Sequence, residues 1–239
     1  MNILITGGAS GLGEAITKQL ASISSNNVYF TYSKSADQAR SIEIQFSNTK
    51  AIHCNFEDSS TVLSLLSAFE KFDIHVLINN ALTGLQTTHF HKIEPNHFTL
   101  SFAKNVLPVL QITQGAILYF RKQKNGKIIT VLSSYIIDKP PIGLSEYVAE
   151  KNYLLSLTKS WAIENIKFNI TSNSISPSFM QTPLTADTDE RVIEEMIKAH
   201  PNKKLLSPGE VAIAVQRLIN IEPNMTGTNL IMNSASDIF

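Results

Sequence analysis

The chain has 239 residues, 43% of them hydrophobic, with twenty acidic and twenty basic side chains and a formal net charge of zero at pH 7. Balanced charge gives no overall field that would favour nucleic acid or an anionic membrane as a partner. The single cysteine, Cys54, excludes an internal disulfide framework and a metal–thiolate cluster. This length fits one large α/β domain over residues 1–239 better than two small ones.

The first residues lead directly into an apolar segment. They lack the basic start, apolar core and small-residue cleavage site of a secretory signal. No uncharged apolar run reaches the roughly 18–20 residues that span a bilayer. The sequence therefore predicts a cytoplasmic protein without a membrane partner.

Short apolar, β-branched runs alternate along the chain with longer amphipathic stretches. The runs predicted as strands are 2–6, 27–32, 50–54, 74–79, 127–133, 169–176 and 228–232. The stretches predicted as helices are 11–23, 36–47, 58–72, 96–123, 145–166 and 208–220. This alternation predicts a Rossmann-like, doubly wound α/β fold, with a parallel sheet of about seven strands and helices on both faces. Residues 177–206 are irregular and rich in proline and charge, so we expect a mobile cover over the substrate with a short helix inside it.

A glycine-rich turn joins the first predicted strand to the first predicted helix. It reads TGGASGLG from Thr6 to Gly13, with four glycines in eight residues. Without Cβ atoms the backbone can approach a pyrophosphate, and the free N–H groups of the helix start point at that anion. A plain tight βα turn is the alternative interpretation, but the number of glycines favours a dinucleotide-binding turn.

The spacing Thr-Gly-x-x-x-Gly-x-Gly resembles that of the compact, single-domain short-chain dehydrogenases/reductases, and the resemblance covers essentially the whole chain. NNAL at 79–82 resembles the family's Asn-Asn-Ala-Gly, and KNV at 104–106 resembles the segment with its catalytic asparagine. Residues 172–184 resemble its Asn-x-Ile-x-Pro-Gly…Thr segment. Among family members, the chain looks most like the 3-oxoacyl-carrier-protein reductases.

Ser134, Tyr147 and Lys151 match the family's Ser-x12-Tyr-x3-Lys. Four residues of helix place Tyr147 and Lys151 about 6 Å apart along one face. Hydride transfer to a carbonyl leaves negative charge on oxygen, which a positioned acid must protonate. A free tyrosine has a pKa of about 10, which a nearby cation lowers. We therefore expect Lys151 to lower the pKa of Tyr147, although two polar residues on a solvated helix face would show the same spacing.

The resemblance implies a role for each of these residues. Ser134 would orient the substrate oxygen, and Lys151 would also hold the nicotinamide ribose. Asn105 would anchor a water that links Lys151 to solvent. For Ser134 and Asn105, a merely structural role is the alternative.

The residues expected to bind the cofactor lie in the glycine turn, at the strand ends and after the sixth strand. They are Thr6, Gly7, Ser10, Gly11, Leu12, Gly13, Tyr32, Ser33, Lys34, Asn55, Phe56, Asn80, Ala81, Tyr147, Lys151, Pro177, Met180 and Thr182. Tyr32 stands where NAD-selective relatives typically carry an acidic residue, whereas Ser33 and Lys34 can bind a 2′-phosphate. We therefore predict a preference for NADP(H), with NAD(H) as the alternative, although Ser10 replaces a residue that is often basic in NADP-selective relatives.

The predicted substrate mouth is mostly apolar, which favours a ketone or aldehyde with an apolar portion. Its residues are Tyr135, Ile136, Pro141, Ile142, Leu144, Phe179, Met180 and Leu184. We expect no metal site, because His89, His91 and His97 do not have the spacing of a recognised one.

The sequence favours an NADP(H)-dependent oxidoreductase acting on a small-molecule carbonyl or alcohol, with no nucleic-acid partner. By resemblance it assembles as a homodimer or homotetramer through helices 96–123 and 145–166. Leu82 and Ser178 replace family glycines, so cofactor affinity and the local backbone path are expected to differ. These two positions keep open a second hypothesis, a dinucleotide-binding redox sensor or scaffold without turnover. A nucleotide-sugar epimerase is less favoured, since few residues follow the last predicted strand.

Overall fold

The computed structural model describes residues 1–137 and 139–236, so Asp138 and positions 237–239 of the expected 1–239 domain lie outside the described residues. Within them, seven parallel strands form one sheet in the order β3-β2-β1-β4-β5-β6-β7. The strands are β1 (Asn2–Ile5), β2 (Asn27–Tyr32), β3 (Thr49–His53), β4 (Val76–Asn79), β5 (Gly126–Val131), β6 (Ile170–Pro177) and β7 (Asn229–Met232). The doubly wound parallel sheet predicted from the sequence is confirmed. Strand order reverses between β1 and β4, which is where such sheets bind ligands at their carboxyl ends.

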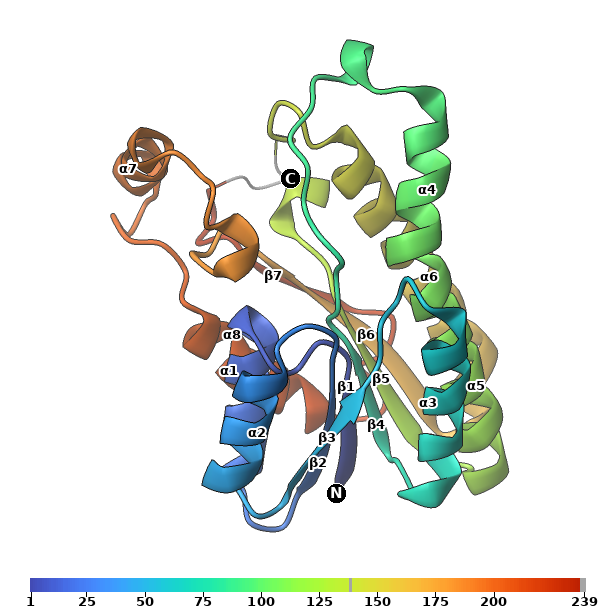
Figure 1. Ribbon diagram of the computed structural model, residues 1–239. Helices are drawn as coiled ribbons and strands as arrows, with labels where there is room; N and C mark the ends of the chain where they lie inside the picture. Colours follow the sequence, from blue (N-terminus) through green and yellow to red (C-terminus); the bar gives the residue numbers. More distant parts are fainter. Residues whose placement is uncertain (138, 237–239) are drawn as a thin grey trace.

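Helices cover both faces of this sheet, as Figure 1 shows. They are α1 (Gly11–Ala21), α2 (Ala36–Gln45), α3 (Ser59–Lys71), α4 (Pro95–Asn105), α5 (Leu107–Gln123), α6 (Ser145–Asn165), α7 (Glu190–Ala199) and α8 (Pro208–Ile219). The helices α1, α2 and α8 pack on one face, and α3, α5 and α6 pack on the other. No helix in the described part of the chain is long and apolar enough to cross a membrane.

Side chains that point alternately to the two faces of the sheet form a separate hydrophobic core on each face. In β1, Ile3 and Ile5 join the core under α1, α2 and α8, whereas Leu4 joins the core under α3, α5 and α6. Successive side chains of a strand point to opposite faces, so Ile3, Leu4 and Ile5 are all apolar and buried. Burial does not make every strand apolar, since β6 is buried throughout and carries Ser172 and Asn173.

The predicted helix 96–123 is in fact two helices. The first, α4, ends at Asn105, and α5 begins at Leu107. Pro108 has no N–H to donate to the carbonyl of Lys104, so a continuous helix would lose a hydrogen bond and clash there. The break places Asn105 at the end of a helix, beside the loop that follows β4.

The segment after β6 contains the short helix expected there. This helix, α7, stands apart from the sheet near the carboxyl ends of the strands in Figure 1, and none of its residues is buried. Nearby, the Ser178 N–H donates to the β7 carbonyl of Met232 at 2.9 Å. Sheet pairing therefore continues through the position where the family has glycine, which fixes the backbone path.

Candidate active site

The glycine turn after β1 is shaped by its backbone conformation and by the end of β2. Gly7 and Gly11 have φ values of +66° and +53°, in the left-handed region that favours glycine. The Gly7 N–H donates to Thr31 Oγ1 and the Gly8 N–H donates to the Thr31 carbonyl, both at 2.8 Å. Thr31 is absent from the sequence predictions, since its place inside an apolar strand hid the role of its hydroxyl.

Thr6 and Asn80 join this turn to the end of β4. The Thr6 hydroxyl accepts hydrogen bonds from the N–H groups of Asn80 and Ala81 at 3.0 and 3.1 Å. The Asn80 amide donates to the carbonyls of Thr6 and Gly7 at 3.0 and 3.2 Å. These side-chain bonds of Thr6 and Asn80 lie within the protein and hold the glycine turn against the end of β4.

The turn fits the pyrophosphate of a nicotinamide dinucleotide. A Cβ at Gly13 would lie 1.9 Å from the Gly7 carbonyl oxygen, and a Cβ at Gly7 would lie 2.9 Å from Ala81 Cα. Ser10 is exposed and precedes α1 without a side-chain cap bond. The first N–H groups of a helix have no acceptor within it and attract anions. Leu12, by contrast, packs against the core.

The residues expected near the adenosine end lie at the ends of β2 and β3. Ser33 and Lys34 are exposed, and the ring of Tyr32 packs edge-on against a histidine of β3. The side-chain oxygen of Asn55 accepts a backbone N–H within its own turn, so its amide nitrogen is the group left for adenine. Phe56 is 7% exposed and belongs to the core, which leaves only its backbone for a ligand.

The segment after β6 returns to the glycine turn. Pro177 ends β6, and Met180 packs partly buried against the core beside α1. A Cβ at Gly11 would lie 3.4 Å from Thr182 Cβ. The structure thus brings Thr182 to the turn that the sequence associated with the same cofactor.

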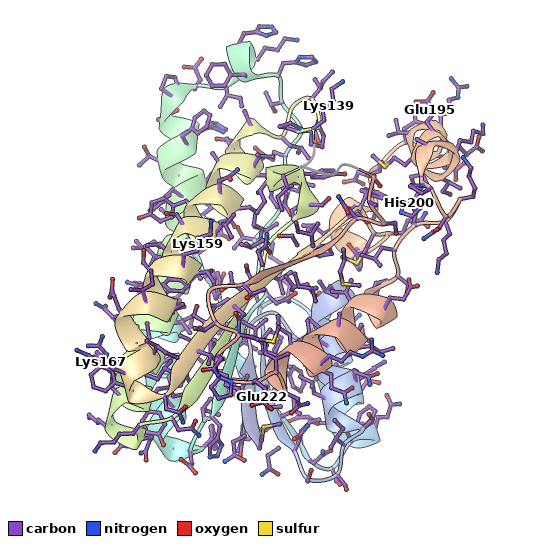
Figure 2. The ribbon with its side chains drawn as sticks, turned by 180° about the vertical axis from the view of Figure 1, so that it is seen from behind. Lys139, Lys159, Lys167, Glu195, His200 and Glu222 are labelled. Carbon is purple, nitrogen blue, oxygen red and sulfur yellow. The ribbon has the colours of Figure 1, made fainter. Side chains whose placement is uncertain are left out.

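Lys151 reaches from α6 to the carboxyl end of β5. It is 6% exposed, and its Nζ donates to the Val131 carbonyl at 2.8 Å. The same nitrogen lies 5.7 Å from the centroid of the Tyr147 ring. Figure 2 labels Lys159, two turns further along α6, which is exposed. Lys151 therefore does not lie on a solvated helix face. Burial lowers the pKa of its amine to about 8, and the negative charge of Glu150 partly offsets this by raising it.

The pKa of Tyr147 departs from the sequence prediction. Burial raises the pKa of the phenol, a hydrogen bond with the Ser133 side chain lowers it, and the charge of Glu150 raises it. The sequence predicted a pKa lowered by Lys151. The direction is reversed because desolvation of the phenolate is the largest effect and because the lysine amine bonds the Val131 carbonyl.

Ser133, not Ser134, places its hydroxyl at the phenol of Tyr147. Its Oγ also accepts the Tyr135 N–H at 3.3 Å, capping the short 3-10 helix η2 (Ser134–Ile136). Ser134 is 1% exposed, and its hydroxyl has no hydrogen-bond partner in the described part of the chain. The sequence prediction selected Ser134 as the serine that orients the substrate oxygen, and that role stays a prediction. The structure adds Ser133, the first hydroxyl after β5, as a second candidate beside the phenol.

Asn105 ties the loop after β4 to α6. Its Oδ1 accepts from the N–H and the hydroxyl of Thr83 at 3.0 and 2.6 Å, and its side chain also hydrogen-bonds Glu150. Leu82, in place of a family glycine, lines a small cavity together with Asn105 and Lys151. The leucine therefore faces the lysine side of the site.

Ala81 connects the two halves of the site, since it packs against Gly7 and lines the same cavity as Lys151. The glycine turn and the Tyr147–Lys151 pair consequently flank one short loop. The described residues contain no group of three or more His, Cys, Asp or Glu side chains arranged to hold a metal ion.

Comparison with known proteins agrees with this geometry. Residues 1–192 match the model of the short chain dehydrogenase family. The chain is 29% identical to a D-beta-hydroxybutyrate dehydrogenase of Rhizobium meliloti, covering 96% of each protein. It is also 29% identical to a 3-oxoacyl-[acyl-carrier-protein] reductase of Thermotoga maritima, over 92% of this chain and 90% of the relative.

Solved structures extend the comparison to the fold. A 3-ketoacyl-(acyl-carrier-protein) reductase of Brucella melitensis complexed with NADH superposes with a TM-score of 0.88 at 26% identity, covering 99% of this chain and 98% of that one. An actinorhodin polyketide ketoreductase with NADPH gives the same TM-score at 19% identity, over 99% and 97% of the two chains, and supports the fold alone. The family predicted from the motifs is confirmed: this chain belongs to the short-chain dehydrogenase family of oxidoreductases.

Proposed function

We propose that this protein transfers a hydride between NADP(H) and the carbonyl or alcohol of a partly apolar small molecule, with Tyr147 as general acid and base. The observation that carries the proposal is the meeting of three groups at the carboxyl end of β5. The Tyr147 phenol bonds the Ser133 side chain, and the Lys151 amine is held at Val131 beside the phenol ring. A nicotinamide bound along the glycine turn would supply or accept the hydride.

Each of the three groups has a task during reduction. The Ser133 hydroxyl donates a hydrogen bond to the substrate oxygen and orients it. Tyr147 gives its proton to that oxygen as negative charge develops there. The pKa of Lys151 is about 8, so its amine is mainly cationic at neutral pH and favours the phenolate that remains. Oxidation of an alcohol runs through the same positions in reverse.

The preference for NADP(H) is supported by the end of β2. Ser33 and Lys34 are exposed there, and the first carboxylate after them is Asp37 in α2. A 2′-phosphate gains charge-assisted hydrogen bonds from such a pair, whereas a ribose diol needs an acceptor. In the test, Lys34→Ala should raise the KM for NADPH more than that for NADH. Lys122→Ala, an exposed lysine of α5, should change neither.

The apolar segment after β6 supports a partly apolar substrate and a covering role for residues 177–206. Phe179 and Met180 are half-buried there, while Leu184 and Val192 are 43% and 41% exposed. Relatives named as hydroxybutyrate dehydrogenase and 3-oxoacyl reductase make short hydroxyacyl and oxoacyl compounds the first substrates to try.

Exposed apolar side chains on α5 and α6 support assembly as a homodimer or homotetramer. Leu118 and Ile163, on these two helices, are 60% and 79% exposed. Light scattering on the purified protein tests this assembly, and a monomeric mass would contradict it.

Turnover is tested by following NADPH consumption with a panel of oxoacyl thioesters, ketones and aldehydes. Tyr147→Phe should lower kcat at least about 100-fold, the typical contribution of a general acid, while dinucleotide binding by calorimetry is retained. Tyr153→Phe is the matched control, because Tyr153 lies on the same helix, is 44% exposed and keeps its ring contact as phenylalanine. Equal turnover by both variants would refute the assignment. Binding without any turnover by wild type would favour the sensor hypothesis.

A further inference from the structure

A small cavity lies behind Lys151, between α6, the end of α4 and strands β4 and β5. Its volume is about 10 Å³, room for one water molecule. Besides Lys151, the polar residues that line it are Asn79, Asn105, Thr130 and Glu150.

Three buried oxygen atoms of these lining residues lack a partner. Asn79 Oδ1, Thr130 Oγ1 and Glu150 Oε1 make no hydrogen bond within the described residues, and their side chains belong to residues that are 3%, 1% and 8% exposed. Native proteins satisfy buried polar atoms with protein groups or with ordered water. A water bound in the cavity can serve these oxygens and the lysine amine together.

Glu150 and Lys151 interact through this space without touching. Each charge shifts the pKa of the other group, yet no ion pair within 4.0 Å joins them among the described residues. Ser101 and Asn105 of α4 donate hydrogen bonds to the Glu150 carboxylate and hold it in place. A water in the cavity that both residues line can bridge them.

The surroundings of Glu150 raise the pKa of its carboxyl group above the ordinary value. Burial is the largest effect and raises the pKa of the carboxyl group, against the hydrogen bonds from Ser101 and Asn105. The charged neighbours are Lys151, which lowers this pKa, and Glu146, which raises it; both belong to α6. From α4, β4 and β5 only uncharged side chains line the cavity with it.

We infer that Glu150 is a positioning residue that exchanges a proton with Lys151 through a water bound in this cavity, and so restores the Tyr147–Lys151 pair after each reduction. The inference rests on the proposed function. In the step, the O–H bond of the Glu150 carboxylic acid breaks as its proton passes to the water. The water gives a different proton to the Lys151 amine, where an N–H bond forms. Glu150 is left as a carboxylate, which regains a proton from solvent. The step is a proton transfer in which no group is oxidised or reduced.

The test compares Glu150→Gln, which keeps the shape and hydrogen bonding of the side chain, with Glu164→Gln, which removes one exposed carboxylate from the same helix. Glu150→Gln should lower kcat about tenfold or more, with KM values unchanged within about twofold. Wild-type kcat for reduction should fall as pH rises through the titration of Glu150, and the Glu150→Gln profile should be flat there. If both variants match wild type in kcat and pH profile, the inference is wrong.

Two measurements need no substrate. Infrared spectra of wild type and Glu164→Gln should contain a protonated carboxyl band that titrates with pH and shifts in D2O, and Glu150→Gln should lack it. The Tyr147 phenolate, identified by its loss in Tyr147→Phe, should form at lower pH in Glu150→Gln because a negative charge is gone. Unchanged spectra in both experiments would overturn the inference even if the protein reduces no carbonyl. Absence of turnover by wild type would instead count against the proposed function.

A folding defect is handled by a second variant. If circular dichroism shows Glu150→Gln to be unfolded, Glu150→Asp keeps the carboxyl group and withdraws it by one methylene. A lowered kcat with unchanged KM values would support the proton exchange in that variant, and an unchanged kcat would contradict it.

Discussion

Gly13→Ala should destabilise the glycine turn and weaken dinucleotide binding. The added Cβ would lie 1.9 Å from the Gly7 carbonyl oxygen, whereas real Cβ contacts essentially never fall under 3.0 Å. The carbonyl must therefore retreat by roughly 1 Å, a shift of the kind that typically costs about 1–3 kcal/mol. It also strains the Asn80 amide, which donates to that carbonyl at 3.2 Å and whose nitrogen would lie 2.6 Å from the new methyl group.

A favourable effect opposes this strain. Replacing glycine with alanine in a helix gains about 1 kcal/mol of propensity, whereas a weakened hydrogen bond loses a similar amount. The net loss should be about 2 kcal/mol, or a Tm lower by about 4–8 °C for a chain of this size. Since the moved carbonyl belongs to the turn that approaches the pyrophosphate, Kd for NADPH should rise about tenfold or more.

Thermal unfolding by circular dichroism and NADPH titration by calorimetry measure the two effects. Gly209→Ala is the matched control, because Gly209 also lies in the first turn of a helix, α8, and a Cβ there would meet nothing within 4 Å. That variant should be as stable as wild type or slightly more stable. If Gly13→Ala has the same Tm and the same Kd for NADPH as Gly209→Ala, the contact between position 13 and the Gly7 carbonyl does not restrict the side chain as inferred.

Three further predictions concern single side chains. Ser133→Ala should lower kcat about 10- to 100-fold, the scale of a lost donor to the reacting oxygen, whereas Ser134→Ala should leave kcat within about twofold; a larger effect at Ser134 would restore the prediction from sequence. Lys151→Met should abolish turnover but resist urea better than wild type near neutral pH. The pKa of Lys151 is about 8 when folded, below its unfolded value, so the unfolded chain binds the extra proton and wild-type stability rises with pH up to about pH 10. The extra stability of Lys151→Met over wild type should therefore shrink between about pH 8 and about pH 10. A difference that stays constant with pH would contradict a buried, charged Lys151. Asp58→Ala removes an oxygen that accepts the Ser60 N–H at 2.9 Å at the start of α3; the loss should be about 1 kcal/mol by urea unfolding, and an unchanged midpoint would show that the cap contributes nothing.

Much of the fold follows from local pattern. Parallel strands covered on both faces are mostly rich in apolar residues, so runs such as 27–32 are visible without any tertiary information, and this one coincides with β2. The glycine turn is equally local, because close packing of Gly13 on the Gly7 carbonyl leaves no space for a side chain. The break before α5 also has a local cause, since Pro108 has no N–H to donate to the carbonyl of Lys104. The amphipathic pattern continues across the break, so the sequence prediction joined the two helices.

By itself, the sequence determined the α/β class, the dinucleotide turn and the helical spacing of Tyr147 and Lys151. Only the tertiary structure placed the Ser133 hydroxyl at the phenol of Tyr147, where Ser133 and Ser134 are both buried at the 3-10 turn after β5. It also decided that burial raises the pKa of Tyr147 and that Glu150 lies beside a buried cavity. Spacing along a helix sets which residues share a face, whereas their solvation depends on what other elements pack against that face. Proton affinity follows solvation, so the chemistry of this site is settled by α4, β4 and β5 as much as by α6 itself.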